Sequence, residues 1–400
     1  MKIYEIGTGY TPIPAAIGAA TEIVVEELTK AFLKQGVDTE IVDIAAEQRA
    51  ANHLPIREVR VPGCFSGTDV QLGIMHKLKR VVYSVALVGE LKKILKQETE
   101  PVVLHFHNQY NLFFFLKLVP ASLRKKARIA YTVHSYIWHG KWSDIRTLVS
   151  KRYFQEIYCV KNADDVFVLN GQTEFNMHKY LNVAADRIHL IDNGVNVDTY
   201  VPVAEGEKDK IKTDCQLTDK KVFIQVGSVC ERKNQLEAIR LLLPVMKEDT
   251  NVVFCYAGGL IDGEYQKQIL KFAEENQIKD QVRYVGEMKP GYDLNKLYNC
   301  AEAMVFPSKA EGFSLVVLEA MSAGVPVLIG HNLHFALETC CLRYHDSASF
   351  VEIIDKYIRD PLEKHTISDQ VRRSVVEQYS WDKIATDYLT AFQNGVKENV

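Results

Sequence analysis

The order of apolar and polar positions divides the chain into short apolar runs that alternate with longer segments of helical spacing. The short runs are rich in valine and isoleucine and show little alternation, which is typical of strands buried on both faces of a parallel sheet. Segment 19–36 has helical spacing and ends at Gly36, a common helix stop. We expect strands over residues 2–6, 38–44, 101–106, 128–134, 164–170, 187–193, 221–227, 251–258, 281–286, 301–308 and 324–330.

Strands that alternate with helices predict an α/β fold, and the restart of the series after residue 200 predicts two doubly wound, Rossmann-like domains. The expected seam is segment 196–216, which is polar, charged and poor in helical or strand periodicity. We expect an N-terminal domain over 1–200, a C-terminal domain over 201–379 and a closing helix over 380–400 that packs back on the N-terminal domain. Open α/β sheets bind ligands beyond the carboxyl ends of their strands, so we expect the site in a cleft between the domains.

Composition narrows the class of protein. Among the 400 residues, 47% are hydrophobic and 25% charged, the balance of a soluble globular protein. The net charge of −3 gives no field that favours nucleic acid. The eight cysteines show neither C-x-x-C nor zinc-finger spacing, which indicates reduced thiols and a cytoplasmic location. The N-terminus lacks the layout of a signal peptide, and no apolar stretch reaches the ~18 residues of a membrane span.

Residues 311–324, EGFSLVVLEAMSAG, place two carboxylates in an otherwise apolar run. We expect a helix from Ser314 to residue 323, because Ser314 is a good N-cap and Gly324 is a strong stop. The amides of residues 312–315 would then form a site for negative charge. Glu319 lies on a helix without a wide polar face, so its carboxylate needs a partner. Two interpretations stay open: an internal ion pair, or the vicinal hydroxyls of a bound ribose.

The segment PSKAEGFSLVVLEAMSAGVPVL (307–328) resembles the E-x7-E motif of the retaining GT-B glycosyltransferases, most closely glycosyltransferase family 4. Other segments resemble the family in the same order over nearly the whole chain: the glycine loop and first helix (14–36), YTVHSY (131–136), NGVNVDTYVP (193–202), VGSVCERKNQ (226–235), YAGG, VRYVGE and the closing YSWDKIATDYL. The resemblance implies transfer of a hexosyl unit from a nucleotide diphosphate sugar, by preference a UDP-sugar, to an acceptor hydroxyl with retention. It implies a place in cell-envelope polysaccharide, glycolipid or glycoprotein synthesis.

The resemblance also implies catalytic roles. Lys233, with Arg232 beside it, would clamp the leaving diphosphate, because cations that face developing negative charge stabilise the transition state. The family's paired arginine would fall at position 228, where this chain has Ser228. Glu311 would hydrogen-bond the donor sugar rather than act as a nucleophile, since the family is thought to use front-face attack. His134 would contact the hydroxymethyl group of the sugar.

The implied nucleotide- and donor-binding set consists of glycines, residues that offer backbone amides, and two glutamates. Gly18 would bring its amide and the preceding loop toward the diphosphate and the acceptor, because glycine suits close backbone approach to a phosphate. The full set is Glu319, Gly312, Phe313, Ser314, Leu315, Gly18, Gly227, Ser228, Gly286 and Glu287.

We expect no metal and no other cofactor, since the chain lacks a D-x-D carboxylate pair of the kind that holds a divalent ion to a nucleotide diphosphate. His105 and His107 lie two residues apart at a strand end and therefore on one face. The pair could suggest metal binding, but the sequence shows no third ligand, and a cleft-lining or structural role is favoured.

The expected partners are the nucleotide-sugar donor and a carbohydrate, lipid-linked or protein glycan acceptor. Segment 76–97 is a long helical pattern with basic ends, and an apolar run within 111–128 precedes a basic cluster. One interpretation is peripheral contact with an anionic membrane at its inner face, which would suit a lipid-linked acceptor. The other is a buried helix with solvated lysine ends.

Two other function classes compete with the transferase. A Rossmann dehydrogenase would use the G-x-G of Gly7 and Gly9, but Pro12 stands where the third glycine of that motif should be. A non-catalytic GT-B protein that binds glycans or supports a partner enzyme is kept open by Ser228. Release of UDP from a donor sugar would separate the enzyme from both.

Overall fold

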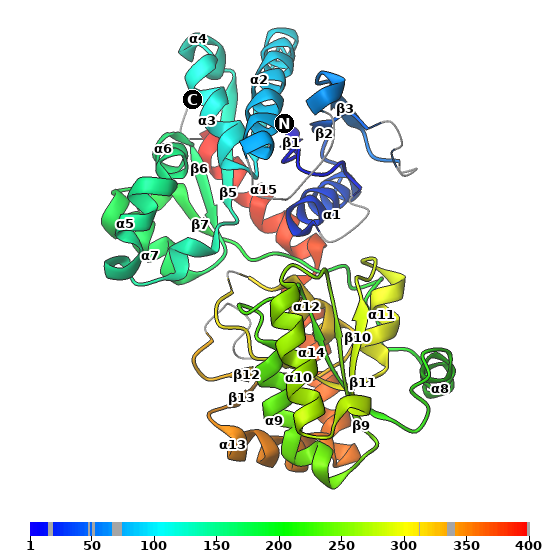
Figure 1. The fold of residues 1–400 in the computed structure, drawn as a ribbon. Helices are drawn as coiled ribbons and strands as arrows, with labels where there is room; N and C mark the ends of the chain where they lie inside the picture. The colour runs from blue at the N-terminus through cyan, green and yellow to red at the C-terminus, as the bar shows by residue number, and fades with distance from the viewer. Residues whose placement is uncertain are drawn as a thin grey trace. The chain divides into compact units, whose positions relative to one another are not determined.

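The structure is a computed structural model that describes residues 1–14, 19–46, 49, 53–65, 74–311, 313–333 and 341–397. The chain forms two compact units, whose elements are labelled in Figure 1. Unit 1 comprises Met1–Asn193 together with Trp381–Val400, and unit 2 comprises Gly194–Ser380. Each unit holds one parallel sheet with helices on both faces, which confirms the expected pair of doubly wound α/β domains.

The described strands of unit 1 follow the order β3-β2-β1-β4-β5-β6-β7, and neighbouring strands are parallel. These strands are β1 (Lys2–Ile6), β2 (Thr39–Ile44), β3 (Ile56–Val59), β4 (Val102–Phe106), β5 (Ala127–Val133), β6 (Asp165–Val168) and β7 (Ile188–Leu190). The helices are α1 (Ala20–Lys34), α2 (Ile74–Gln97), α3 (Gln109–Leu118), α4 (Ala121–Arg124), α5 (Trp142–Arg152), α6 (Phe154–Asn162), α7 (Gly171–Leu181) and α15 (Trp381–Lys397).

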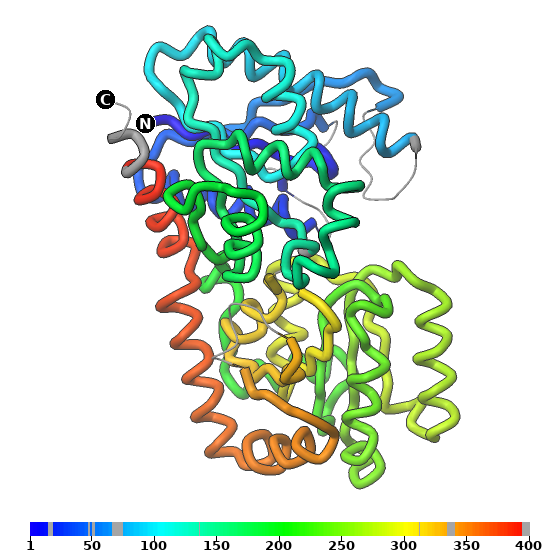
Figure 2. Tube along the Cα trace, turned by 90° about the vertical axis from the view of Figure 1, so that its left-hand side faces the viewer, coloured from blue at the N-terminus to red at the C-terminus, as the bar shows by residue number. Residues whose placement is uncertain are grey.

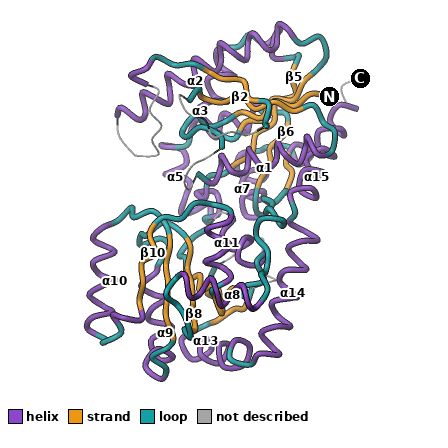
Figure 3. The backbone as a smooth tube through the Cα atoms, turned by 90° about the vertical axis from the view of Figure 1, so that its right-hand side faces the viewer, coloured by secondary structure: helices purple, strands orange, loops and turns teal. Residues whose placement is uncertain are grey.

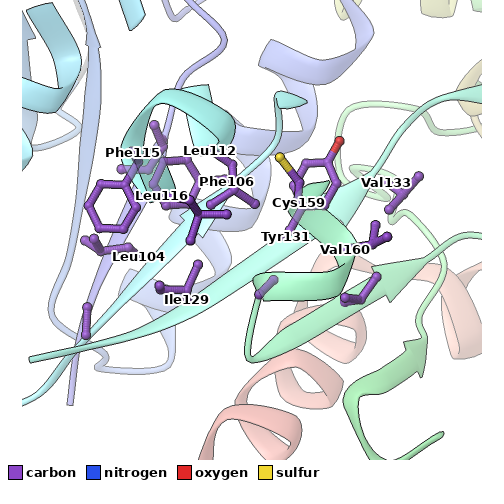
Figure 4. Close-up of a cluster of buried hydrophobic side chains, with 14 of the residues drawn as sticks. Leu104, Phe106, Leu112, Phe115, Leu116, Ile129, Tyr131, Val133, Cys159 and Val160 are labelled. Carbon is purple, nitrogen blue, oxygen red and sulfur yellow. The ribbon is translucent and has the colours of Figure 1, made fainter. Parts of the chain in front are cut away.

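The two faces of the unit 1 sheet carry different side chains, because successive strand residues point to opposite faces. One face packs against α3 and α6 in an apolar core (Figure 4) that includes Leu104, Phe106, Leu112, Phe115, Leu116, Ile129, Tyr131, Val133, Cys159 and Val160. On the other face α15 packs beside α1, where the rings of Phe32 and Phe392 lie 6.4 Å apart. The closing helix, red in Figure 2, therefore belongs to unit 1, as the sequence predicted.

The described strands of unit 2 follow the order β10-β9-β8-β11-β12-β13 and are also parallel; Figure 3 shows both sheets in orange. The strands are β8 (Lys221–Val226), β9 (Val252–Ala257), β10 (Val282–Gly286), β11 (Ala301–Phe306), β12 (Val327–Gly330) and β13 (Leu342–Tyr344). The helices are α8 (Glu205–Asp214), α9 (Gln235–Glu248), α10 (Gly263–Glu275), α11 (Tyr292–Asn299), α12 (Leu315–Ser322), α13 (Ser347–Ile353) and α14 (Pro361–Tyr379).

Sequence patterns missed three elements. The expected seam, segment 196–216, contains helix α8. Ile211 is the only buried side chain of this helix, so its sequence shows no apolar periodicity. Its glutamates and lysines are helix formers, and Lys208 pairs with Glu205 one turn away. The strands β3 and β13 are short, carry charged residues and lie at the edges of their sheets, where charged side chains are common.

Each sheet has one point at which the strand order reverses, and in open α/β sheets ligands bind at that point. In unit 1 the reversal lies between β1 and β4, and in unit 2 between β8 and β11. The loops that leave the carboxyl ends of these strands are where a site is expected in each unit. No helix in the described part of the chain combines the length and apolar character that a membrane span requires.

Candidate active site

The switch point of unit 2 joins the loop after β8 to the loop after β11. The amide of Lys309 donates to the carbonyl of Arg232 at 2.9 Å, and Nδ2 of Asn234 donates to the carbonyl of Pro307 at 3.2 Å. Asn234 adopts a left-handed conformation (φ 60°) that ends the first loop and starts α9. These contacts fix the charged residues that the two loops carry.

Glu311, after β11, meets the two cations that follow β8. Its Oε1 lies 2.7 Å from Nζ of Lys233 and 3.1 Å from the guanidinium of Arg232, and it accepts a hydrogen bond from the hydroxyl of Ser308. The Glu311 and Lys233 side chains are 6% and 11% exposed, whereas Arg232 is 39% exposed. Three residues that the sequence singled out therefore form one cluster, and its carboxylate already has internal cationic partners.

Lys233 is buried beside the ring of Phe306 and the backbone of Gly227. Its Nζ is 5.1 Å from the centre of the Phe306 ring, and burial lowers its pKa while Glu311 opposes that shift. A Cβ at Gly227 would stand 3.2 Å from Cε of Lys233, so a side chain there would crowd the lysine stem. The carbonyl of Lys233 accepts from Nε2 of Gln225 at 2.6 Å, which anchors the backbone beneath the side chain.

Three adjacent strands, β8, β9 and β10, run into glycines with positive φ: Gly227 (144°), Gly258 (143°) and Gly286 (91°). The amide of Gly258 donates to the carbonyl of Gly286 at 2.8 Å. A Cβ at Gly258 would stand 2.2 Å from the carbonyl oxygen of Gly227, so no side chain fits there. The predicted donor-binding set included Gly227 and Gly286 but not Gly258, although the segment YAGG at the end of β9 indicated it. A Cβ at Gly286 would meet nothing within 4 Å, so of the three glycines Gly286 leaves the backbone most open to a ligand.

Glu319 projects from α12 and is 6% exposed. Its Oε2 accepts a hydrogen bond from the hydroxyl of Tyr298 at 2.8 Å. Burial raises the pKa of Glu319 to about 7, while hydrogen bonds from Tyr298 and Tyr200 oppose the shift. Within the described ranges no lysine or arginine forms an ion pair with this carboxylate, so the internal ion pair considered above is not found. Sequence reasoning did not foresee the two tyrosines, which come from distant segments.

The remaining donor-binding residues lie around this edge or outside the described residues. Ser314 is the N-cap of α12, but its side chain makes no capping hydrogen bond. Phe313 and Leu315 flank it, so three predicted residues stand at the start of the helix, where backbone amides lack intrahelical acceptors. Gly18 and Gly312 lie outside the described residues.

Ser228 and Glu287 are placed by the β8 and β10 loops. The carbonyl of Ser228 accepts from Nε2 of Gln235 at 3.0 Å. Glu287 is exposed, and its Oε1 would lie 3.3 Å from a Cβ built at Gly259. The β10 loop therefore presents a carboxylate to Gly259, the second residue after β9.

The predicted site histidine of unit 1 belongs to a buried polar cluster. His134 follows β5 and is partly exposed, and its Nε2 lies 3.0 Å from Nδ1 of His107. His105 and His107 both contact the carboxylate of Glu5, which confirms that they share one face. A metal ion could be held by the carboxylate and the two imidazoles of this cluster, Glu5, His105 and His107, because their ligand atoms lie within 4.8 Å of one another. The expectation that His105 and His107 have no third ligand was wrong, because the register of β1 with β4 places Glu5 beside them. The four ring nitrogens of the two histidines are hydrogen-bonded within the cluster.

Comparison with known proteins gives the family. The model of Glycosyltransferase Family 4 matches residues 21–199, and that of Glycosyl transferases group 1 matches residues 207–374. The chain belongs to glycosyltransferase family 4. It is thus a glycosyltransferase of the GT-B type, and the resemblance noted in the sequence is confirmed.

Relatives of this glycosyltransferase are distant. An uncharacterized glycosyltransferase of Methanocaldococcus jannaschii is 23% identical over 304 residues, 73% of this chain and 75% of the relative. The UDP-Gal:alpha-D-GlcNAc-diphosphoundecaprenol alpha-1,3-galactosyltransferase of Escherichia coli is 22% identical over 330 residues, 78% of this chain and 82% of the relative. The solved sucrose-phosphate synthase of Thermosynechococcus elongatus matches with a TM-score of 0.75 at 20% identity, over 98% of each chain, a likeness that shows the shared fold.

Proposed function

We propose that this glycosyltransferase moves a hexosyl unit from a UDP-sugar to an acceptor hydroxyl with retention of the anomeric configuration. The observation that carries the proposal is the cluster of Lys233, Arg232 and Glu311 at the switch point of unit 2. The Escherichia coli relative, named for UDP-Gal and a diphosphoundecaprenol-linked acceptor, supports a UDP-sugar donor and a role in cell-envelope polysaccharide, glycolipid or glycoprotein synthesis.

The nucleotide would be held by α12 and the loops beside it. Glu319, without a cationic partner in the described residues, has carboxylate oxygens that can accept from the vicinal hydroxyls of a ribose. The first amides of α12 can donate to phosphate oxygens, and the helix dipole favours negative charge there. The glycine-lined ends of β8, β9 and β10 admit the ligand close to the backbone.

Donor binding would exchange the partners of the charged cluster. A diphosphate that approaches Lys233 and Arg232 competes with Glu311 for both cations, because phosphate oxygens form strong charge-assisted hydrogen bonds. Glu311, once released, can accept a hydrogen bond from a hydroxyl of the donor sugar. The buried Lys233 then keeps a positive charge beside the phosphate without a competing carboxylate.

In the chemical step the bond between the anomeric carbon and the diphosphate oxygen breaks, and its electron pair goes to the leaving diphosphate. The acceptor oxygen forms the new bond on the same face, and its proton passes to a phosphate oxygen. Lys233 and Arg232 face the charge that grows on the leaving group, so they stabilise the transition state more than the ground state. Because these two side chains supply the positive charge that a divalent ion supplies to a leaving diphosphate in other enzymes, we propose that transfer needs no metal.

A lipid-linked acceptor would suit the surface of unit 1. The start of α2 carries exposed Met75 and Leu78 next to the exposed Lys77, the mixture of apolar and basic groups that lies against anionic lipid. We propose peripheral membrane contact through this segment. Co-sedimentation with anionic vesicles at low and high salt tests it: binding at low salt alone supports the contact, and no binding at low salt removes it.

Release of UDP from UDP-sugars, measured with purified protein, tests the transferase. The proposal expects release that depends on Lys233. The competing interpretation is a non-catalytic GT-B protein, which the presence of Ser228 in place of the family's arginine favours. That protein would bind glycans without releasing UDP from any donor.

A further inference from the structure

A chain of hydrogen bonds runs through the switch point of unit 1, from β1 across β4 to the end of β5. Glu5 on β1 is directly paired with His105 on β4 in the sheet register. The side chains of Glu5, His105 and His107 are all 0% exposed. One oxygen of the carboxylate bonds Nδ1 of His105 at 2.9 Å, and the other bonds Nε2 of His107 at 2.7 Å.

The chain has two branches that leave the carboxylate in different directions. Through His107 it reaches His134, with 3.0 Å between Nδ1 of His107 and Nε2 of His134. Through His105 it reaches Oγ1 of Thr132 at 2.7 Å, and Thr132 lies 3.2 Å from the hydroxyl of Tyr388 on α15. Only the first branch ends at His134, the histidine that the family resemblance implies at the donor sugar.

The direction of each hydrogen bond in the first branch follows from its neighbour. An ionised carboxylate only accepts, so Nε2 of His107 carries the proton that it donates to Glu5. Nδ1 of a neutral His107 then has a lone pair and accepts from Nε2–H of His134. A neutral His134 with its proton on Nε2 has its lone pair on Nδ1.

We propose that Glu5 and His107 are positioning residues that hold His134 as the neutral tautomer protonated on Nε2, so that Nδ1 accepts a hydrogen bond from a substrate hydroxyl. This inference rests on the proposed function, because the substrate hydroxyl is one of the glycosyl donor or acceptor. A carboxylate that accepts a hydrogen bond from one ring nitrogen of a histidine fixes which nitrogen carries the proton. Here the imidazole of His107 lies between the carboxylate of Glu5 and the imidazole of His134.

The electrostatics of the branch agree with these protonation states. Burial alone would raise the pKa of Glu5, but the facing His105 and His107 lower it to about 2, so the carboxylate is ionised. Burial and then the nearby His105 lower the pKa of His107 to about 4. Burial and then His107 lower the pKa of His134 well below its ordinary value. Both imidazoles of the branch are neutral at pH 7.

Nitrogen NMR of the histidine rings in ligand-free protein tests the inference directly, because the protonated and unprotonated ring nitrogens give well-separated resonances. The wild type should show His134 as a single neutral tautomer with the proton on Nε2. A His134 that is protonated on Nδ1, that carries both protons, or that exchanges between tautomers would overturn the proposal without any variant.

Three variants separate positioning from general packing. His107→Leu removes the acceptor and should replace the single His134 tautomer by a mixture. His107→Gln should keep the tautomer, because its carboxamide can donate to Glu5 and accept from His134. His105→Leu loses a comparable hydrogen bond to Glu5 in the other branch and should leave the His134 signals unchanged. Equal changes in His107→Leu and His105→Leu would contradict the inference.

Kinetics give the second readout. With a UDP-sugar donor, His107→Leu should lower kcat/KM ~10-fold, the effect of losing one hydrogen bond, and His107→Gln should recover most of it. Failure of the protein to release UDP from any donor would refute the proposed function and leave the ligand-free NMR result standing. A normal kcat/KM in folded His107→Leu would refute the positioning role.

Discussion

Glu319→Gln should change how the stability of the protein depends on pH. The pKa of Glu319 is raised from 4.5 to about 7 by burial, so the folded state favours the neutral carboxyl. The stability that comes from this preference is fully present below the pKa of the unfolded chain, near 4.5, and is lost as pH rises through about 7. The carboxamide of the Glu319→Gln variant is neutral at every pH, so the variant lacks this loss.

The magnitude follows from the shift. One pKa unit corresponds to about 1.36 kcal/mol, so the wild type loses about 2 to 3 kcal/mol of unfolding free energy from this group between about pH 5 and pH 8. The variant should therefore gain about 2 to 3 kcal/mol relative to the wild type over the same interval. In the folded state at pH 5 both side chains are neutral, so the difference there reports the altered hydrogen bond with Tyr298 together with the ionisation of Glu319 in the unfolded wild type.

Urea unfolding of both proteins at pH 5, 6, 7 and 8 measures this difference. Glu275→Gln is the matched control, because that side chain is 61% exposed on α10 and its removal should not change the pH dependence. Parallel pH profiles of the wild type and Glu319→Gln would refute the reasoning, since they would mean that folding does not shift the Glu319 pKa. The same variant should weaken UDP binding ~10-fold, the loss of one charged acceptor for ribose hydroxyls.

Three further outcomes follow from the site. Lys233→Ala should lower kcat for UDP release at least ~10-fold, with a smaller effect on KM, and an unchanged kcat would exclude the clamp. The same variant should destabilise the fold by about 3 kcal/mol, because Glu311 stays buried with one cationic partner fewer. Gly258→Ala should destabilise the fold by more than about 1 kcal/mol in thermal unfolding. Gly263→Ala is the control and should have a smaller effect, because a Cβ at Gly263 would meet nothing within 4 Å. Equal effects of the two variants would contradict the close approach of Gly258 to Gly227. Activity should persist in excess EDTA, and loss of activity that Mg²⁺ or Mn²⁺ restores would refute transfer without a metal.

The sequence predicted the fold well because buried parallel strands and amphipathic helices leave strong local patterns. Each expected strand is present, and α12 begins and ends where Ser314 and Gly324 indicated. The helix α8 was missed because helix formers without an apolar stripe leave no period to detect. Local pattern therefore determined the strands in the middle of each sheet, and failed for the surface helix α8 and for the short edge strands β3 and β13.

The candidate site was predicted residue by residue, but its contacts were not. Lys233 and Glu311 meet because β8 and β11 are neighbours in the sheet, a pairing that no local pattern encodes. The tyrosines that hydrogen-bond Glu319 come from segment 193–202 and from α11, and the motif resemblance gave neither tyrosine a role. Glu5 looked like one polar residue in a first strand, and its contact with both histidines depends on the register of β1 with β4.

Binding of a nucleotide diphosphate sugar at the switch point of unit 2 is tested most directly by thermal stability in the presence of UDP-, GDP- and ADP-sugars, with the wild type and Lys233→Ala side by side. At a hundred times its dissociation constant a ligand of the folded state stabilises by ~2.7 kcal/mol. We predict a rise in melting temperature with a UDP-sugar that Lys233→Ala reduces. No rise with any of the three nucleotide sugars, or an equal rise in both proteins, would contradict the assignment of this site.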